Sequence, residues 1–158
     1  MKREAWSVLG AAAASLALVA CEDATTNLVP GATVQVDLSE WKIVTSRAMA
    51  PAGRLVINVA NKGADVHNLI FLETDRAPDS LPTTAAGDVD VTGPGVLVVA
   101  EVKDVAPGST GQVTLEDTVP DKYVFVTTVA TSNGMTTGHP YKLGMFKGFT
   151  LTEVPGQE

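Results

Sequence analysis

The chain has 158 residues, of which 45% are hydrophobic, and this is enough for one domain with its own core. Its formal net charge is −7 at pH 7, from 18 acidic and 11 basic side chains, so its surface is unsuited to nucleic acid. It has a single cysteine, which excludes an internal disulfide.

Residues 1–20 have the pattern of an export signal. A short basic start precedes an apolar run that is too short to span a bilayer securely. The run ends in Leu18-Val19-Ala20-Cys21, which resembles a bacterial lipobox, where the peptide is cut and the new N-terminal cysteine is lipidated. We therefore predict a lipoprotein signal peptide, lipidation of Cys21 and a lipid anchor on the cell membrane or outer membrane. An ordinary secretory signal with a coincidental cysteine is the alternative, and either signal places the domain outside the cytoplasm, in the periplasm or at the cell surface.

Residues 21–31 are mostly small and polar and end in Pro30-Gly31, which predicts a tether between the lipid and the domain. Residues 32–156 then form a single predicted domain. Removal of the signal also removes Lys2, Arg3 and Glu4, so the formal charge changes from −7 to −8.

From Thr33 onward, apolar and polar residues alternate with a period of two in several segments, which predicts half-buried strands. Two other segments are nearly continuous apolar runs rich in β-branched residues, typical of strands covered on both faces or at a sandwich centre. The alternating sets are Val34-Val36-Leu38, Leu55-Ile57-Val59 and Val113-Leu115, and the continuous runs are 68–72 and 96–102.

About eight short strands separated by proline and glycine turns, with no convincing amphipathic helix, predict an all-β fold, an antiparallel Greek-key β-sandwich. Trp41 and Tyr123 are expected to be core aromatics. The long polar connection 73–95 is expected to be either a packed excursion or a mobile flap, with a turn of helix near 77–81.

His67 and His139 are the chain's two histidines, and Met145 follows the second on a glycine-flanked loop before the last predicted strand. In a Greek-key sandwich, such loop ends can meet at one pole although they are distant in sequence. Two imidazoles and a thioether would form a soft site suited to copper. Taken singly, each residue has a plainer interpretation: a hydrogen-bonded strand-end histidine, a loop histidine and a core methionine.

Several segments along the chain together form a recognisable series of motifs. In the first half they are Val36-Asp37-Leu38-Ser39-Glu40-Trp41, Pro51-Ala52-Gly53, Val59-Ala60-Asn61-Lys62-Gly63 and Val66-His67-Asn68-Leu69, and in the second half 105–108, 123–126, Gly138-His139 and Lys142-Leu143-Gly144-Met145. In this order the segments resemble the cupredoxin family, and above all its small secreted or lipid-anchored copper proteins. The similarity covers nearly all of residues 33–154.

In that family copper is bound by a histidine after an asparagine-x-glycine turn, a cysteine that ends the penultimate strand, a second histidine and a methionine. The resemblance places the histidines on His67 and His139 and the methionine on Met145. Counted from Tyr123, the cysteine position falls on Thr127. The family's thiolate is therefore missing from the predicted site.

Two further departures surround that position. The segment 128–138 is longer than the family's spacing, and Pro140 adds a residue between His139 and Met145, which is expected to displace the sulfur. Met135 in the longer segment is a weaker candidate ligand, with an exposed loop methionine as the alternative.

A threonine hydroxyl is neutral and hard, so it cannot replace the thiolate that suits copper to rapid electron transfer. The remaining ligands favour Cu(I) if the thioethers bind, or a loosely held Cu(II) on two imidazoles. The sequence thus predicts an extracytoplasmic cupredoxin-like copper-binding protein, either a divergent electron carrier or a copper-holding protein, with a redox or copper-transfer protein as partner.

A second hypothesis comes from the missing cysteine and the enlarged segment 128–138. It is a metal-free β-sandwich that serves as a binding or assembly module on the membrane surface. No nucleophile–base pair, phosphate loop or paired-acid signature is present in the sequence, so we do not predict an enzyme. The scattered carboxylates are expected to be mostly solvated surface: Asp88, Asp90, Asp104, Glu116 and Asp117.

Overall fold

The computed structural model describes residues 31–154 except 129, 133–134 and 137. The predicted signal peptide, Cys21, almost all of the tether and residues 155–156 lie outside the described residues, so those predictions stand untested. Within the described part, no helix is long and apolar enough to cross a membrane.

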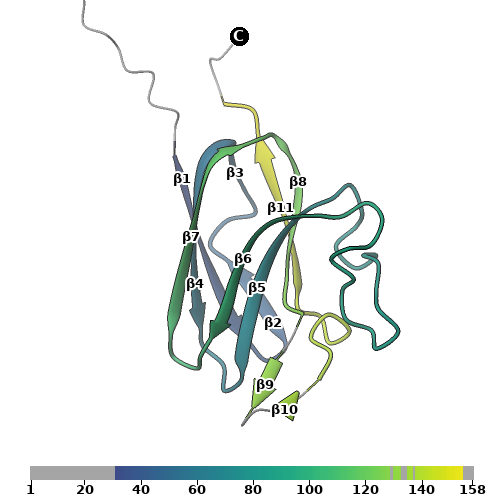
Figure 1. Ribbon diagram of the computed structural model, residues 1–158. Coiled ribbons are helices and arrows are strands. Elements are labelled where there is room, and N and C mark those ends of the chain that lie inside the picture. Colours follow the sequence, from purple (N-terminus) through teal and green to yellow (C-terminus); the bar gives the residue numbers. More distant parts are fainter. Residues whose placement is uncertain (1–30, 129, 133–134, 137, 155–158) are drawn as a thin grey trace, which may run out of the picture.

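The described residues form eleven β-strands arranged as a β-sandwich, which confirms the predicted all-β fold (Figure 1). Eight of these strands have four or more residues, in agreement with the number expected. The strands are β1 (Ala32–Ser39), β2 (Lys42–Thr45), β3 (Met49–Pro51), β4 (Gly53–Asn61), β5 (Val66–Glu73), β6 (Leu97–Val105), β7 (Thr110–Thr118), β8 (Asp121–Val126), β9 (Ala130–Ser132), β10 (Met135–Thr136) and β11 (Phe146–Thr152).

One sheet has the strand order β2-β1-β4-β7, and the other has the order β10-β9-β5-β8-β11-β3 with β6 also paired to β5. The sequence predicted antiparallel pairing throughout, and this is wrong for two strand pairs. β1 pairs with β4 in parallel, and β11 pairs with β3 in parallel. The chain leaves β1 through β2 and β3 before β4 returns on the other side of β1 in the same direction. An indirect connection of this kind permits parallel pairing, whereas a direct hairpin does not.

The core lies between the two sheets and follows the predicted alternation. Val34, Val36 and Leu38 of β1 are fully buried, as are the inward residues of β4, namely Leu55, Ile57 and Val59. Four aromatic rings fill the middle: Phe71 stacks on Tyr123 with ring centroids 4.8 Å apart, and Phe125 and Phe149 pack edge-on or tilted beside them. Period-two patterning therefore identified the inner face correctly.

A second apolar cluster lies on the outer face of β5 and β8. Ile70 and Leu72 of β5 contact residues of the long connection that follows this strand, including Leu81 and Val89. The connection is therefore a packed excursion. The predicted helical turn near 77–81 is instead a single tight turn, in which the Ser80 N–H donates to the Ala77 carbonyl at 2.9 Å. A helix cannot continue because Pro82 follows and the Leu81 N–H donates to the Tyr141 hydroxyl instead.

The expectation that both faces of 96–102 are covered is wrong for the start of β6. Leu97 is 60% exposed and Val98 is 42% exposed. This end of β6 pairs with β5, and no strand in the described part of the chain pairs along its other edge there. An apolar run alone does not distinguish a central strand from a peripheral one.

Tyr123 gives the fold a specific alkaline response. Its ring is buried and its hydroxyl donates to the Val119 carbonyl at 2.8 Å. Burial, together with the nearby carboxylates of Glu73 and Asp121, raises the pKa of Tyr123 from 10.0 to about 12. The folded protein therefore holds the phenolic proton more tightly than the unfolded chain, so this stabilisation is complete below the ordinary tyrosine pKa and is lost as pH rises through the raised one.

We expect Tyr123→Phe to flatten the alkaline loss of the free energy of unfolding, because phenylalanine has no proton to lose. Urea unfolding from neutral pH to about pH 12 measures this. Tyr141 is present in both proteins and serves as an internal control. An equal alkaline loss in wild type and variant would contradict the assignment.

Candidate metal centre

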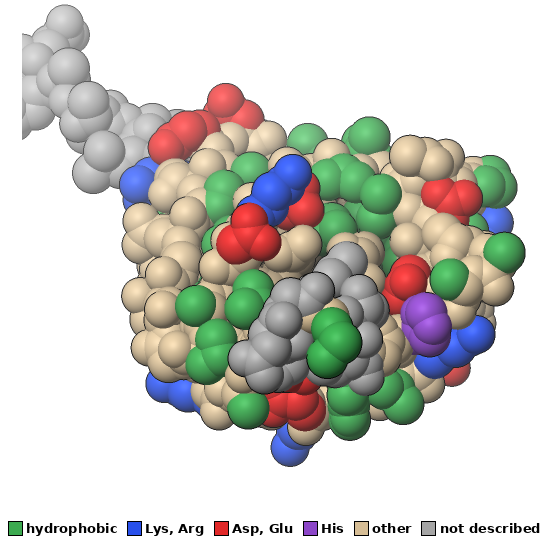
Figure 2. Space-filling model, turned by 60° about the horizontal axis from the view of Figure 1, so that its bottom comes forward, with side chains coloured by type: hydrophobic (Ala, Val, Ile, Leu, Met, Phe, Trp, Pro, Cys, Tyr) green, Lys and Arg blue, Asp and Glu red, His purple; other side chains and the backbone are tan. Residues whose placement is uncertain are grey.

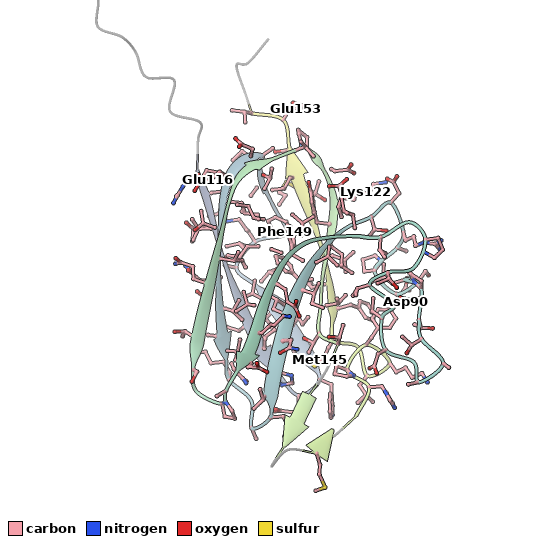
Figure 3. All side chains as sticks on the ribbon, in the orientation of Figure 1. Asp90, Glu116, Lys122, Met145, Phe149 and Glu153 are labelled. Carbon is pink, nitrogen blue, oxygen red and sulfur yellow. The ribbon has the colours of Figure 1, made fainter. Side chains whose placement is uncertain are left out.

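The loops that carry the predicted site residues meet at one end of the sandwich. A methyl group added at Gly138 would come within 3.0 Å of the Trp41 ring, so Gly138, the residue before His139, lies against the β1–β2 turn. Glu40 in that turn contacts His67. Figure 3 shows Met145 toward the end where β9 and β10 lie, with Phe149 farther along the core. Loops distant in sequence thus share one pole, as Greek-key topology allows.

His67 is the second residue of β5, and its side chain is fully buried. It continues the inward alternation of Leu69 and Phe71, which face the core between the sheets. Its Nε2 lies 3.3 Å from Glu40 Oε1, whereas its Nδ1 is buried without a hydrogen-bond partner. A buried polar atom left unpaired costs about 1–3 kcal/mol, which singles out Nδ1 as an atom in need of a ligand.

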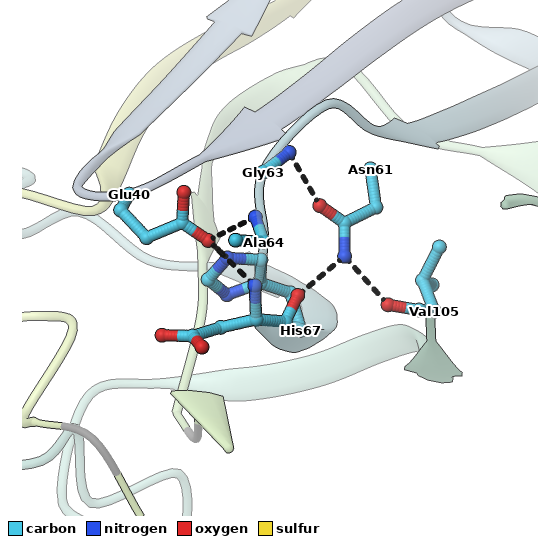
Figure 4. A network of polar contacts seen from close by, with 7 residues as sticks. Glu40, Asn61, Gly63, Ala64, His67 and Val105 are labelled. Atoms are coloured by element: carbon cyan, nitrogen blue, oxygen red, sulfur yellow. Dashed lines mark hydrogen bonds and ion pairs between the residues drawn. The ribbon is translucent and has the colours of Figure 1, made fainter. Parts of the chain in front are cut away.

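Asn61 fixes the turn that leads into His67. Its side-chain Nδ2 donates to the carbonyls of Asp65 and Val105, both at 2.7 Å, and its Oδ1 accepts from the Gly63 N–H at 2.9 Å (Figure 4). Asn61 is itself buried. The β4–β5 turn is thereby tied to the end of β6, and the start of β5 has a defined position.

Glu40 lies in the turn between β1 and β2, and its side chain contacts the β4–β5 turn. Its Oε1 accepts hydrogen bonds from the N–H groups of Ala64 and Asp65, both at 2.8 Å (Figure 4). Partial burial by itself would raise the Glu40 pKa, but these bonds, a bond from its own backbone and the His67 contact together lower it. The carboxylate is therefore ionised at neutral pH and acts as an acceptor.

Thr127 and Met145 are the next buried groups at this end. Val126 pairs with Ile70 of β5 on one side and Phe146 of β11 on the other, so Thr127 follows between these two strands. Its N–H donates to the Met145 carbonyl at 3.4 Å. The Thr127 Oγ1 is buried without a hydrogen-bond partner, and the Met145 side chain is fully buried among core residues.

His139 has a different environment. Its side chain is 44% exposed, and its Nδ1 lies 3.1 Å from Asp88 Oδ2. Figure 2 looks onto this end and shows a histidine side chain at the surface beside acidic and basic groups. Asp88 is one of five carboxylates that were expected to be mostly solvated surface, and it is the partner of His139, because the long connection packs against the loop. Its Oδ1 is buried and lacks a hydrogen-bond partner.

The long connection also holds the loop that contains His139 and Met145. The Tyr141 hydroxyl accepts from the Leu81 N–H at 2.9 Å and donates to the Pro78 carbonyl at 3.0 Å. Within the loop, the Met145 N–H donates to the Pro140 carbonyl at 2.9 Å, and Gly144 adopts a positive φ of 98°, which favours glycine. The loop is thus tight and clamped from outside.

The described residues contain no group of three or more histidine, cysteine, aspartate or glutamate side chains that could hold a metal ion. Met135, the weaker candidate, lies in β10 and is 71% exposed. The donors at the pole are of another kind, with one imidazole nitrogen, one thioether and one hydroxyl, all buried. An unpaired imidazole nitrogen and a buried thioether are both donor types that copper binds, so the residue types at this pole fit copper.

Sequence reasoning did not identify Glu40 or Asp88 as site residues. Glu40 is 27 positions from its partner His67 in the chain, and Asp88 is 51 positions from His139. Both contacts depend on how separate loops pack, and the sequence carries no spacing signal for either. The only available hint was that Glu40 belongs to the segment that resembles the cupredoxins.

No protein-family model and no curated protein matches the sequence. Among solved structures, the chain is similar to dithionite-reduced auracyanin from the photosynthetic bacterium Roseiflexus castenholzii, at 18% identity over 78% of this chain and 99% of that one, with a TM-score of 0.49. It is similar to rusticyanin from Thiobacillus ferrooxidans at 17% identity over 78% and 79% of the two chains, with a TM-score of 0.47. The chain is also similar to a multicopper oxidase at 17% identity, with a TM-score of 0.38. This match covers 77% of this chain and 41% of the oxidase chain.

The clamp by Tyr141 can be tested directly. We expect Tyr141→Phe to lower the free energy of unfolding by about 1–3 kcal/mol, because the buried Leu81 N–H and the Pro78 carbonyl each lose a partner. Urea unfolding measures the loss, and faster hydrogen exchange at the Leu81 amide locates it. Ser80→Ala is the matched control, since its hydroxyl donates to the exposed Asp79 carboxylate. Unchanged exchange at Leu81 would show that the phenol does not hold the connection.

Proposed function

We propose that this protein binds one copper ion at the pole of the sandwich, with His67 Nδ1 and the Met145 sulfur as principal ligands. The observation that carries the proposal is the fully buried His67 ring, whose Nδ1 has no hydrogen-bond partner. His139 is the proposed third ligand, from the loop that also carries Met145. Thr127 takes the place of the thiolate and offers a second buried, unpaired atom.

This donor set favours holding copper over rapid electron transfer. Thioether and imidazole donors suit Cu(I), and a neutral hydroxyl cannot replace a thiolate as a path for electrons. When bound, copper would supply a one-electron redox centre. The chain's own contribution is to bury His67 and Met145 and to fix the loop that carries Met145, through the packed core beneath Met145 and the clamp by Tyr141. The protein is thus proposed as a copper-holding protein, with divergent electron transfer as the weaker variant.

A metal-free binding module is the second candidate, and one observation favours it. The His139 Nδ1 already contacts Asp88, and its side chain is partly exposed. In that case His139 would form only a surface contact with Asp88. His67, Met145 and Thr127 would then be the remaining candidate ligands for copper. The copper titration described next distinguishes the metal-binding function from the metal-free one.

We expect the domain to bind one equivalent of Cu(I), and His67→Ala to weaken binding by about 10-fold or more, equivalent to about 1.4 kcal/mol or more. Met145→Leu is expected to act in the same direction with little change in core volume. Met49→Leu is its matched control, since Met49 is 60% exposed on β3. Competition with a chromophoric chelator measures the affinities. Binding that is absent, or indifferent to both variants, would favour the metal-free module.

Thr127→Cys provides a gain-of-function arm for the same experiment. A thiolate at this position would stand with His67 and Met145, so its Cu(II) complex should acquire an intense visible absorption that the wild type lacks. Thr150→Cys, on the exposed face of β11, is the control for an added thiol. Equal absorption from both variants would mean that Thr127 does not face the proposed site.

We also propose that the domain is tethered outside the cytoplasm by a lipid on Cys21, with a redox or copper-transfer protein as partner. The lipobox-like segment and the single cysteine support this. Mass spectrometry of the wild-type N-terminus should find acyl chains on Cys21, and Cys21→Ser should carry no acyl chain and retain the signal peptide, because this cysteine is part of the cleavage site. A wild-type chain that is cleaved but soluble would indicate an ordinary secretory signal.

A further inference from the structure

We infer that Glu40 is a positioning residue for the proposed copper site: its carboxylate holds the His67 ring with the hydrogen on Nε2, so that the buried Nδ1 is the free, metal-binding nitrogen. The inference rests on the proposed function and names the residue that prepares its principal ligand. It follows from three features of the described residues, which are the bonds to one carboxylate oxygen, the isolation of Nδ1 and the absence of a side chain at Gly63.

The bonds to Glu40 Oε1 determine the tautomer of His67. This oxygen accepts from the backbone N–H groups of Ala64 and Asp65, both at 2.8 Å. Backbone amides only donate, so Oε1 presents its lone pairs to them. The His67 Nε2 lies 3.3 Å from the same oxygen and must therefore carry a hydrogen. A neutral imidazole with its hydrogen on Nε2 has its lone pair on Nδ1.

In this tautomer the His67 Nδ1 is available to bind a metal ion. The ring is fully buried, and no protein group in the described part of the chain bonds to Nδ1. A histidine with only a structural role would use its second nitrogen, because an unpaired buried acceptor is unfavourable. Metal-binding histidines commonly have this arrangement, in which a carboxylate orients one nitrogen and the other binds the ion.

Gly63 provides the space that the carboxylate occupies. A Cβ at this position would overlap both oxygens of Glu40, and no positive φ restricts the residue to glycine. The absence of a side chain therefore serves the approach of Glu40 and not the backbone conformation. Gly63→Ala offers a way to displace the carboxylate without removing its charge.

The experiment compares wild type with Glu40→Ala, Glu40→Gln and Gly63→Ala. Two-bond ¹H–¹⁵N correlation spectra of the metal-free proteins report the His67 tautomer, and chelator competition reports Cu(I) and Cu(II) affinity. We expect wild type to carry the hydrogen on Nε2 alone, and Glu40→Ala and Gly63→Ala to show a mixture of tautomers with about 10–100-fold weaker copper binding. Glu40→Gln should retain the tautomer, because its amide oxygen accepts the same bonds, and should lose less affinity.

Glu116→Ala is the control for removing a carboxylate. Glu116 pairs with Arg54 at the exposed surface of the β2-β1-β4-β7 sheet. A wild-type ring with its hydrogen on Nδ1, or variants with unchanged tautomer and affinity, would overturn the inference. Wild-type protein that holds the expected tautomer but binds no copper would instead overturn the proposed function. The spectra come from metal-free protein, so the two failures are distinguishable.

Discussion

The contact between the Glu40 carboxylate and the buried His67 ring is the interaction on which the proposed site depends. It joins the β1–β2 turn of one sheet to the first residues of β5 in the other, and it uses backbone N–H groups of the β4–β5 turn as its anchor. Asn61 reinforces the same turn from the side of β6. An imidazole held in this way has lost its freedom to rotate before any ligand arrives, which reduces the entropic cost of binding one.

The aromatic core supplies the rigidity behind this arrangement. Phe71 lies four residues after His67 on the same face of β5, and it stacks with Tyr123 and contacts Phe125 on β8, the strand that leads into Thr127. The strands that place His67 and Thr127 are therefore fixed to each other by well-packed rings. Dense packing of this kind resists small displacements, so the positions of the groups at the pole follow from the core beneath them.

The long connection contributes a second, outer support. It covers the apolar outer face of β5 and β8, and it bonds to Tyr141 in the loop that carries His139 and Met145. The same connection brings Asp88 to His139. The two histidines consequently differ in character. His67 is buried and held by contacts in the interior, whereas His139 is partly exposed and contacts the long connection, so changes in this connection would affect His139 and spare His67.

The sequence by itself determined the all-β sandwich, the inward faces of β1 and β4, and the positions of His67, His139 and Met145 at strand ends or in loops. It could do so because a period of two and turn residues are local properties of the chain. Only the tertiary structure decided that β1 and β4 run parallel, that β6 is exposed at its start, that Asp88 engages His139 and that Glu40 reaches His67. These features depend on which loops lie beside each other after the sheets have packed, and a pair separated by tens of residues leaves no periodic trace in the sequence.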